Sequence, residues 1–469
     1  YQGYVVLSFL GQRLMVPFPV PYTEAVVLAQ IDRLATDGTI FSDLRAAPFF
    51  PSLYPPLFHL FSTALNAVTG AEILAPRLVS MTAFAVIIPA GCGVIAWAGK
   101  STAERLLGVG LFVCLAVTLQ PIYELATVGI VDMLAAAFSF SCIVVFIVRN
   151  GERLDNSSFA IIAILSSLAF WTKPTALYGP LAVFAFLLTK HAGSAVRLAL
   201  MGAIGALVSG FALWLYFGTD MLTNVFGYTQ TRFAPDRAGY AFAVFWARYL
   251  SLALFTVLIA GICLFSRTLG RLAEYEKLAL YYLLAASLGF FAAARQGSDW
   301  NYMIEFCLAL SLATGFAGIR IGTAIENARQ GAPASLLRAA AGTGLVLLAL
   351  SAVPSGRPFK TSINVGPFEI RETLRLKSKL RTGGQRIFSA DLGMKMMLGQ
   401  EIEVEPATVL AMHRTGLWDI APLTKRIESD VYDCILDHNS ALMAHPEMQA
   451  VISRFPKSET FARYKLYCK

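Results

Sequence analysis

The sequence predicts an all-α polytopic membrane protein with about eleven transmembrane helices and a small C-terminal α/β domain outside the membrane. The chain has 469 residues, of which 56% are hydrophobic and only 14% are charged. Soluble domains carry about 25% charged residues, so this composition indicates a membrane protein. Its apolar runs are long enough to cross a bilayer as helices, which satisfy every backbone polar group internally.

The apolar runs give the expected spans in order. The chain begins at Tyr1, and we expect the first span to be the truncated outer end of a longer helix. The predicted spans cover residues 4–16, 75–98, 105–120, 128–148, 158–171, 175–189, 197–217, 243–265, 277–294, 301–320 and 336–353.

The connections between these spans alternate in charge. One set carries Lys100 and Arg105, then Arg149 and Arg153, Lys190 and Arg197, Arg267, Arg271 and Lys277, and Arg320, Arg329 and Arg338. The other set has fewer basic residues and consists of a long first loop and turns near 121–127, 172–174, 218–242 and 295–300. The positive-inside rule makes the first set cytoplasmic, so the N-terminus is expected inside and the C-terminal part outside.

Two domains follow from this pattern. Residues 1–353 are the predicted transmembrane domain, with a large outer loop at 17–74, and residues 354–469 are the outer domain. Turn residues at 354–358 indicate a linker between them. In the outer domain, helices are predicted at 369–380, 391–398, 407–415, 421–429 and 440–454, and strands at 386–389, 401–404, 432–436 and 464–467.

The cysteines and histidines of the outer domain carry weak signals. Cys434 and Cys468 lie on two predicted strands, and they either form a disulfide in an oxidising compartment or stay reduced. His413, His438 and His445 lack a metal-ligand spacing, and we interpret them as ordinary polar or capping residues.

Ionisable residues gather at the outer ends of the predicted spans, where they are costly and thus candidates for function. They are Glu24 after the first span, Asp132, Lys173, Arg295 and Glu305, with Tyr54, Asn301 and Tyr302 beside them. Most of them also have a purely structural explanation. Lys173 and Arg295 could extend to the membrane surface. Asp132 could cap its helix, and Glu24 could be a solvated loop acid. Tyr54-Pro55-Pro56 could be a rigid helix entry, and Glu305 needs a buried partner such as Lys173 or Arg295.

Cations beside carboxylates at a membrane surface suit an anionic lipid headgroup. A polyprenyl phosphate is such a ligand, because its tail stays in the bilayer while Lys or Arg pairs with the phosphate.

Four segments carry a resemblance to a known superclass: the acid Glu24, Tyr54-Pro55-Pro56-Leu57, Asp132 in 131–134 with Lys173 in 171–174, and 301–305. With the large first outer loop and the C-terminal α/β module, the chain resembles an integral-membrane glycosyltransferase of the GT-C superclass. It is most similar to the bacterial branch related to protein O-mannosyltransferases and aminoarabinose transferases.

The resemblance implies inverting transfer of a sugar from a polyprenyl-phosphate donor to an acceptor hydroxyl, on the periplasmic face of a bacterial inner membrane. The acceptor would be a glycolipid, lipopolysaccharide, a polysaccharide or a protein. Glu24 would be the general base, and Lys173 and Arg295 would bind the donor phosphate. The residues implied to bind or orient substrate are Asp132, Tyr54, Asn301, Tyr302 and Glu305.

Two departures from the family pattern are visible. Thr23 precedes Glu24 where many relatives have Asp, and Tyr54 stands where the aminoarabinose transferases have Lys. No DxD motif is present, so the sequence indicates no metal or other cofactor, although an acid pair can still bind a divalent ion.

Other functions make different predictions. A transporter or flippase of a lipid-linked sugar would place charges near the bilayer midplane and show repeated halves. A lipid-linked glycan ligase or polymerase would share the lipid-phosphate site, and a scaffold would leave the clustered charges unexplained.

Overall fold

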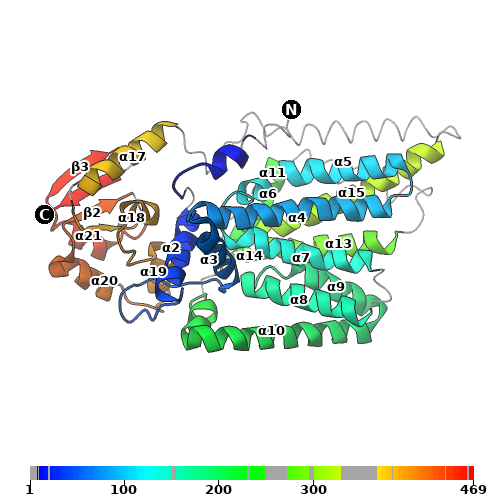
Figure 1. Cartoon of the computed structure of the whole chain (residues 1–469), viewed down its shortest axis with the longest axis horizontal. Coiled ribbons are helices and arrows are strands. Elements are labelled where there is room, and N and C mark those ends of the chain that lie inside the picture. Colours follow the sequence, from blue (N-terminus) through cyan, green and yellow to red (C-terminus); the bar gives the residue numbers. More distant parts are fainter. Residues whose placement is uncertain are drawn as a thin grey trace.

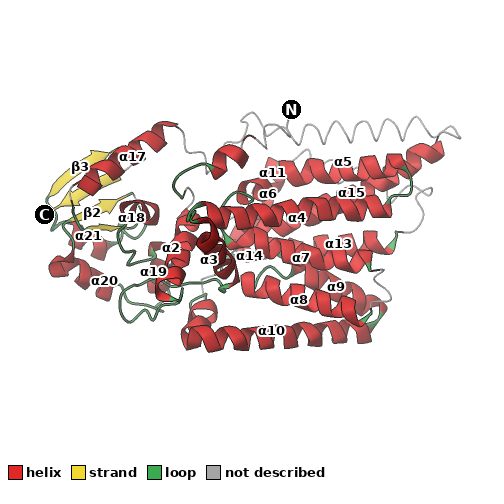
Figure 2. Cartoon of the chain, in the orientation of Figure 1, coloured by secondary structure: helices red, strands yellow, loops and turns green. Residues whose placement is uncertain are grey.

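The chain folds into a long helical bundle with a small α/β domain at one end (Figure 1). The computed structural model describes residues 8, 10–19, 22–149, 155–229, 233–249, 272–294, 300–328, 367–382, 384–438, 440–461 and 464–469. Helices make up the bundle, and the strands of the described chain are confined to the terminal domain (Figure 2).

The bundle helices follow the apolar runs of the sequence. They are α4 (Leu74–Ala98), α5 (Thr102–Thr118), α6 (Gln120–Leu125), α7 (Val131–Val148), α8 (Asn156–Thr172), α9 (Tyr178–Lys190), α10 (Ala192–Leu222), α11 (Pro235–Arg248), α13 (Glu274–Ser287), α14 (Gly289–Ala292) and α15 (Ile304–Ala328). A π-helical turn, η2 (Thr223–Gly227), follows α10, and a 3₁₀ turn, η4 (Trp300–Met303), precedes α15.

Several helices of the bundle are long and apolar enough to span a membrane. Within the described residues, four segments are long and apolar enough to cross a membrane: Leu74–Ala98, Val131–Val148, Ala192–Gly227 and Asn301–Glu326. The predicted count of eleven is not confirmed, since the predicted spans at 4–16, 243–265 and 336–353 lie partly or wholly outside the described residues.

Helix α15 lies at the centre of the bundle and packs closely on α5. A Cβ atom added at Gly318 would lie 2.9 Å from the Cα atom of Gly108, so the two backbones touch there. Small residues permit this kind of close helix contact in membranes. Helix α10 lies at the edge instead, and its Leu207 and Val208 side chains are 73% and 66% exposed, as expected for a lipid-facing surface.

The described connections of the two predicted sets lie at opposite ends of the bundle (Figure 1). At the end away from the α/β domain, Lys190 pairs with Glu274 at 3.1 Å, and Arg320 pairs with Glu276. At the other end are the short connection between α8 and α9, helix α6 and the first loop. The charge pattern therefore separates the two ends of the molecule.

The C-terminal domain is a four-stranded mixed sheet with helices packed on it. Its strands are β1 (Ile387–Ser389), β2 (Cys434–Asp437), β3 (Lys457–Phe461) and β4 (Tyr464–Cys468), in the order β1-β2-β4-β3. Its helices are α17 (Pro367–Thr382), α18 (Leu392–Leu398), α19 (Pro406–Arg414), α20 (Ala421–Arg426) with a π-helical extension η5 (Ile427–Val431), and α21 (Pro446–Ile452). Only the β1–β2 pair is parallel.

Three expectations for this domain are wrong in detail. Residues 401–404 form no strand, because Val404 makes a single bridge to Phe49 of the first loop rather than joining the sheet. Strand β3 was not predicted, because its side chains are mostly polar and exposed, as in an edge strand. The helix expected at 440–454 begins only at Pro446, a residue that favours the first helical position.

Cys434 and Cys468 lie directly opposite each other on β2 and β4, and they form a disulfide. Of the two states that the sequence left open, the structure has the oxidised one.

The first loop lies between the bundle and the α/β domain. It contains α2 (Tyr22–Asp37) and α3 (Leu57–Thr69). The Phe49 N–H donates to the carbonyl of Glu403 at 2.7 Å, and the Trp418 ring N–H donates to the carbonyl of Leu44 at 3.0 Å. On the bundle side, the Asn224 side chain accepts from the Ser52 N–H at 2.9 Å. The loop is therefore held on both sides.

Candidate active site

A buried ion pair between Asp132 and Lys173 lies at the end of the bundle that faces the first loop. Asp132 is in the first turn of α7, and Lys173 ends α8 because Pro174 follows it and disfavours a helical conformation. The two residues are 4% and 5% exposed and pair directly. The Lys173 ammonium also lies 4.0 Å from the centre of the Tyr302 ring. Lys173 thus points into the protein and not toward the membrane surface.

A small cavity of about 20 Å³, enough for a single water molecule, lies beside this pair. Its lining comes from α7, the connection between α8 and α9, and the start of α15: Asp132, Ala136, Lys173, Thr175, Ala176, Tyr178, Asn301, Tyr302, Ile304 and Glu305. The structure thereby brings together five of the eight residues that the sequence singled out.

Three buried oxygen atoms of this cavity have no hydrogen-bond partner among the described residues. They are Oγ1 of Thr175, Oδ1 of Asn301 and Oε1 of Glu305. A buried polar atom without a hydrogen bond costs free energy, and nearly all such atoms in proteins have a partner or a water. Their convergence indicates a cavity built for a polar ligand.

Glu305 is 3% exposed and has hydroxyl partners rather than a cation as its hydrogen-bond donors. Its Oε2 atom accepts from Ser139 at 2.5 Å and from Tyr282 at 3.3 Å. Ser139 in turn accepts from the Gly179 N–H at 2.9 Å. Of the two partners that we expected, Lys173 pairs with Asp132 instead, and Arg295 lies outside the described residues. Oε1 of Glu305 has no hydrogen-bond partner among the described residues.

Tyr54 reaches the same region from the first loop. It packs against a buried cluster that includes Phe58 and Val131. Burial raises the pKa of the Tyr54 hydroxyl, and the positive charge of Lys173 opposes that shift. Because Val131 immediately precedes Asp132, Tyr54 lies near the Asp132–Lys173 pair.

Glu24 lies apart from the cavity lining, in a second buried ion pair. Its carboxylate and the Arg77 guanidinium are both fully buried and form two hydrogen bonds, of 2.8 Å and 2.9 Å. Arg77 also donates to the carbonyls of Val16 and Phe18. Glu24 is therefore not a solvated loop acid, and Arg77 joins the start of α4 to the first turn of α2 and to the chain before it.

The two ion pairs are connected through the turn before α7. The Gly129 N–H donates to Glu24 at 2.9 Å, and Asp132 follows three residues later. The acid of the first loop and the cavity therefore flank the same short segment.

Arg77 was not among the residues predicted from the sequence, although its position in the sequence could have identified it. Arg77 is a single charge in the first turn of an apolar helix, at an end of the bundle where basic residues are otherwise few. Arg295, the second cation predicted to bind the donor phosphate, lies outside the described residues.

A larger cavity of about 280 Å³ lies between α2 and the α/β domain. Its polar lining is already paired, since Tyr22 bonds to Glu405 and Tyr464 donates to Asp391 at 2.8 Å. It therefore gives less indication of a ligand than the cavity beside Lys173.

The chain is similar to known proteins in structure but not in sequence. No family model matches the chain, and no curated protein matches it in sequence. The crystal structure of ArnT from Cupriavidus metallidurans in the apo state superposes with a TM-score of 0.65 at 14% identity, covering 99% of this chain and 96% of ArnT. The structure of the same ArnT bound to undecaprenyl phosphate gives 0.63 at 13% identity, covering 99% and 97%.

An oligosaccharyltransferase from Archaeoglobus fulgidus, in complex with Zn and sulfate, is more distant. Its TM-score is 0.50 at 12% identity, covering 96% of this chain and 69% of that one. The match to ArnT extends over nearly the whole length of both proteins, although the identity is low. The chain therefore shares the fold of ArnT over nearly its whole length.

Proposed function

We propose that this protein is an inverting glycosyltransferase that moves a sugar from a polyprenyl-phosphate donor to an acceptor hydroxyl at the outer face of a bacterial inner membrane. The observation that carries the proposal is the cavity beside Lys173. It combines a buried cation with oxygens of Thr175, Asn301 and Glu305 that have no hydrogen-bond partner among the described residues. A phosphate suits the cation, and sugar hydroxyls suit the oxygens.

The fold supports the donor class. ArnT shares the fold over 99% of this chain, and one of its structures contains undecaprenyl phosphate. The cavity also lies at an end of the bundle, where a lipid phosphate headgroup would sit while its tail remains in the bilayer.

The orientation follows from the charge pattern and the disulfide. The basic connections belong inside by the positive-inside rule, which places the cavity and the α/β domain outside. The Cys434–Cys468 disulfide agrees, since disulfides persist in compartments such as the periplasm.

In the proposed mechanism, Lys173 holds the donor phosphate, together with Arg295. Asp132, Asn301, Tyr302 and Glu305 orient the sugar or the cation, and Tyr54 closes the cavity from the first loop. The acceptor oxygen attacks the anomeric carbon while the bond from that carbon to the phosphate oxygen breaks. The phosphate leaves as an anion, so it needs a cation and not a general acid.

Glu24 is the proposed general base, which takes the proton of the acceptor hydroxyl. In the ion pair with Arg77, both carboxylate oxygens of Glu24 already accept hydrogen bonds. The acceptor must therefore displace one of these bonds for the proton to reach Glu24.

The donor site is tested by measuring undecaprenyl phosphate binding to the full chain in detergent, by native mass spectrometry. We expect Lys173→Met to weaken binding at least tenfold, because the cation that pairs with the phosphate is lost. Lys190→Met is the matched control, since Lys190 is a half-exposed lysine at the opposite end of the bundle. Equal binding by the two variants would contradict the proposed donor site.

A further inference from the structure

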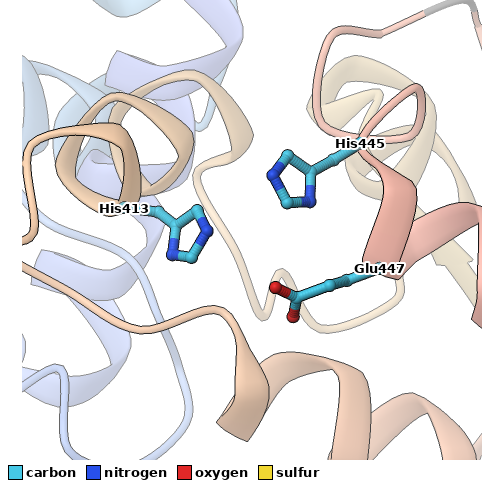
Figure 3. A group of neighbouring side chains, drawn as sticks. All are labelled: His413, His445 and Glu447. Atoms are coloured by element: carbon cyan, nitrogen blue, oxygen red, sulfur yellow. The ribbon is translucent and has the colours of Figure 1, made fainter.

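We propose that the C-terminal domain contains a binding site for a divalent transition metal, with zinc as the preferred ion, formed by His413, His445 and Glu447. The three side chains point toward one another in Figure 3. They come from two helices: His413 is in the last turn of α19, His445 immediately precedes α21, and Glu447 is in the first turn of α21. Two of the five histidines in the chain meet here.

The spacing suits a metal. One ligand atom of each residue lies within 4.8 Å of those of the other two. In a tetrahedral zinc site, with Zn–N bonds of about 2.0–2.1 Å, neighbouring ligand atoms are about 3.3 Å apart. Small side-chain rotations close the difference, because Glu447 is exposed and both histidines are half-buried.

One ring nitrogen of the cluster has no hydrogen bond that would compete with a metal. Nδ1 of His445 is buried without a hydrogen-bond partner among the described residues, although a buried ring nitrogen normally has one. The two imidazole rings are 5.1 Å apart and nearly perpendicular, so they do not stack. A metal between them would satisfy the ring nitrogen and also bind the Glu447 carboxylate.

The backbone around the ligands is held in place. The His445 carbonyl accepts from the Gln449 N–H at 2.9 Å, and the His413 carbonyl accepts from the Gly416 N–H at 3.0 Å. Leu410 of α19 and Met448 of α21 belong to one buried core. The site therefore rests on elements that the fold already positions.

The three ligand side chains indicate which class of metal ion would bind. Two imidazoles with one carboxylate suit zinc and similar transition metals, whereas magnesium and calcium prefer oxygen ligands. A water would complete the coordination.

The site has a structural consequence for the first loop. Glu405 caps the other end of α19 and bonds to Tyr22, the first residue of the helix that carries Glu24. A metal that joins α19 to α21 would fix the domain surface on which α2 rests. The role is thus one of positioning and not of direct catalysis.

The experiment uses the full chain in detergent, freed of metal with a chelator and then titrated with Zn²⁺ by calorimetry. We expect one ion per chain, an at least tenfold weaker affinity in His413→Ala and in His445→Ala, and a smaller loss in Glu447→Gln. His191→Ala is the control, because His191 is an exposed histidine between α9 and α10. It should bind zinc as the unmodified protein does, and magnesium should not compete.

Two further measurements separate loss of the site from loss of the fold. Without metal, the variants should unfold at the same temperature as the unmodified protein, and zinc should stabilise the unmodified protein and His191→Ala more than it stabilises His413→Ala or His445→Ala. X-ray absorption of the zinc complex should show two imidazole ligands. Absence of zinc binding, or unchanged binding in His413→Ala and His445→Ala, would overturn the proposal.

Discussion

At the scale of single residues, the Asp132–Lys173 pair decides how the candidate site is built. Both charges are buried, and each compensates the other. Removing one member of a buried pair leaves an uncompensated charge, which costs about 3–5 kcal/mol, whereas replacing both with neutral groups costs far less.

We therefore expect Asp132→Asn and Lys173→Met each to lower stability by about 3–5 kcal/mol, and the double variant to recover most of that loss. Thermal unfolding in detergent measures the cycle. The Lys190→Met and Glu274→Gln pair is the control, since this half-exposed pair should contribute less than about 1 kcal/mol. Additive losses at Asp132 and Lys173 would show that the two side chains do not depend on each other.

Glu24 is a second residue whose role depends on a partner. As the general base, it should be essential for transfer while contributing nothing to donor binding. As a purely structural partner of Arg77, it should matter only through stability.

Glu24→Gln is expected to lower sugar transfer at least about 10²-fold, because it removes a general base, and to leave undecaprenyl phosphate binding unchanged. Transfer of labelled sugar from extracted polyprenyl-phosphate donors measures the first effect. Arg77→Lys is the comparison, since it keeps the positive charge beside Glu24 and should retain part of the transfer activity. Equal loss of transfer and of stability in both variants would assign the pair a structural role only.

At the scale of elements, the disulfide joins the two central strands of the sheet. Cys434 of β2 and Cys468 of β4 close a segment with a sequence separation of 34 residues. A cross-link of this size is worth about 3–4 kcal/mol in the chain-entropy account.

We expect Cys434→Ser with Cys468→Ser to lower the stability of the α/β domain by about that amount. Limited proteolysis of the full chain at increasing temperature follows the domain. Cys92→Ala is the control, because Cys92 is a free cysteine of α4 in the bundle. The expectation fails if the protein purified without reductant carries free thiols at both positions.

Elements were easier to predict from sequence than the contacts between them. Helices α4, α7 and α10 follow from apolar runs, and Asp132 and Lys173 were visible as rare charges at the ends of such runs. The pairing of Glu24 with Arg77 was not, because 53 residues separate them in sequence and only the fold brings the start of α2 next to the start of α4. The His413–His445 contact was missed for the same reason, since sequence spacing does not report how α19 and α21 pack.

At the scale of the whole molecule, the two ends of the bundle differ in charge and in what they carry. The described basic connections lie at one end, and the first loop and the α/β domain are at the other (Figure 1). The residues that line the candidate site come from the start of α7, the α8–α9 connection and the start of α15. The first loop bonds to both the bundle and the α/β domain, so it couples Glu24 and Tyr54 to both parts. Such an arrangement suits an enzyme whose donor comes from the membrane and whose acceptor arrives from the outer side.

The most direct test of the central claim is a structure of the full chain with undecaprenyl phosphate bound. We predict that the phosphate occupies the cavity beside Lys173, within hydrogen-bond distance of its ammonium, at about 2.7–2.9 Å. The Asn301 and Glu305 oxygens should then face the space where the sugar of a complete donor would lie. A phosphate bound at the opposite end of the bundle, or away from Lys173, would contradict the account.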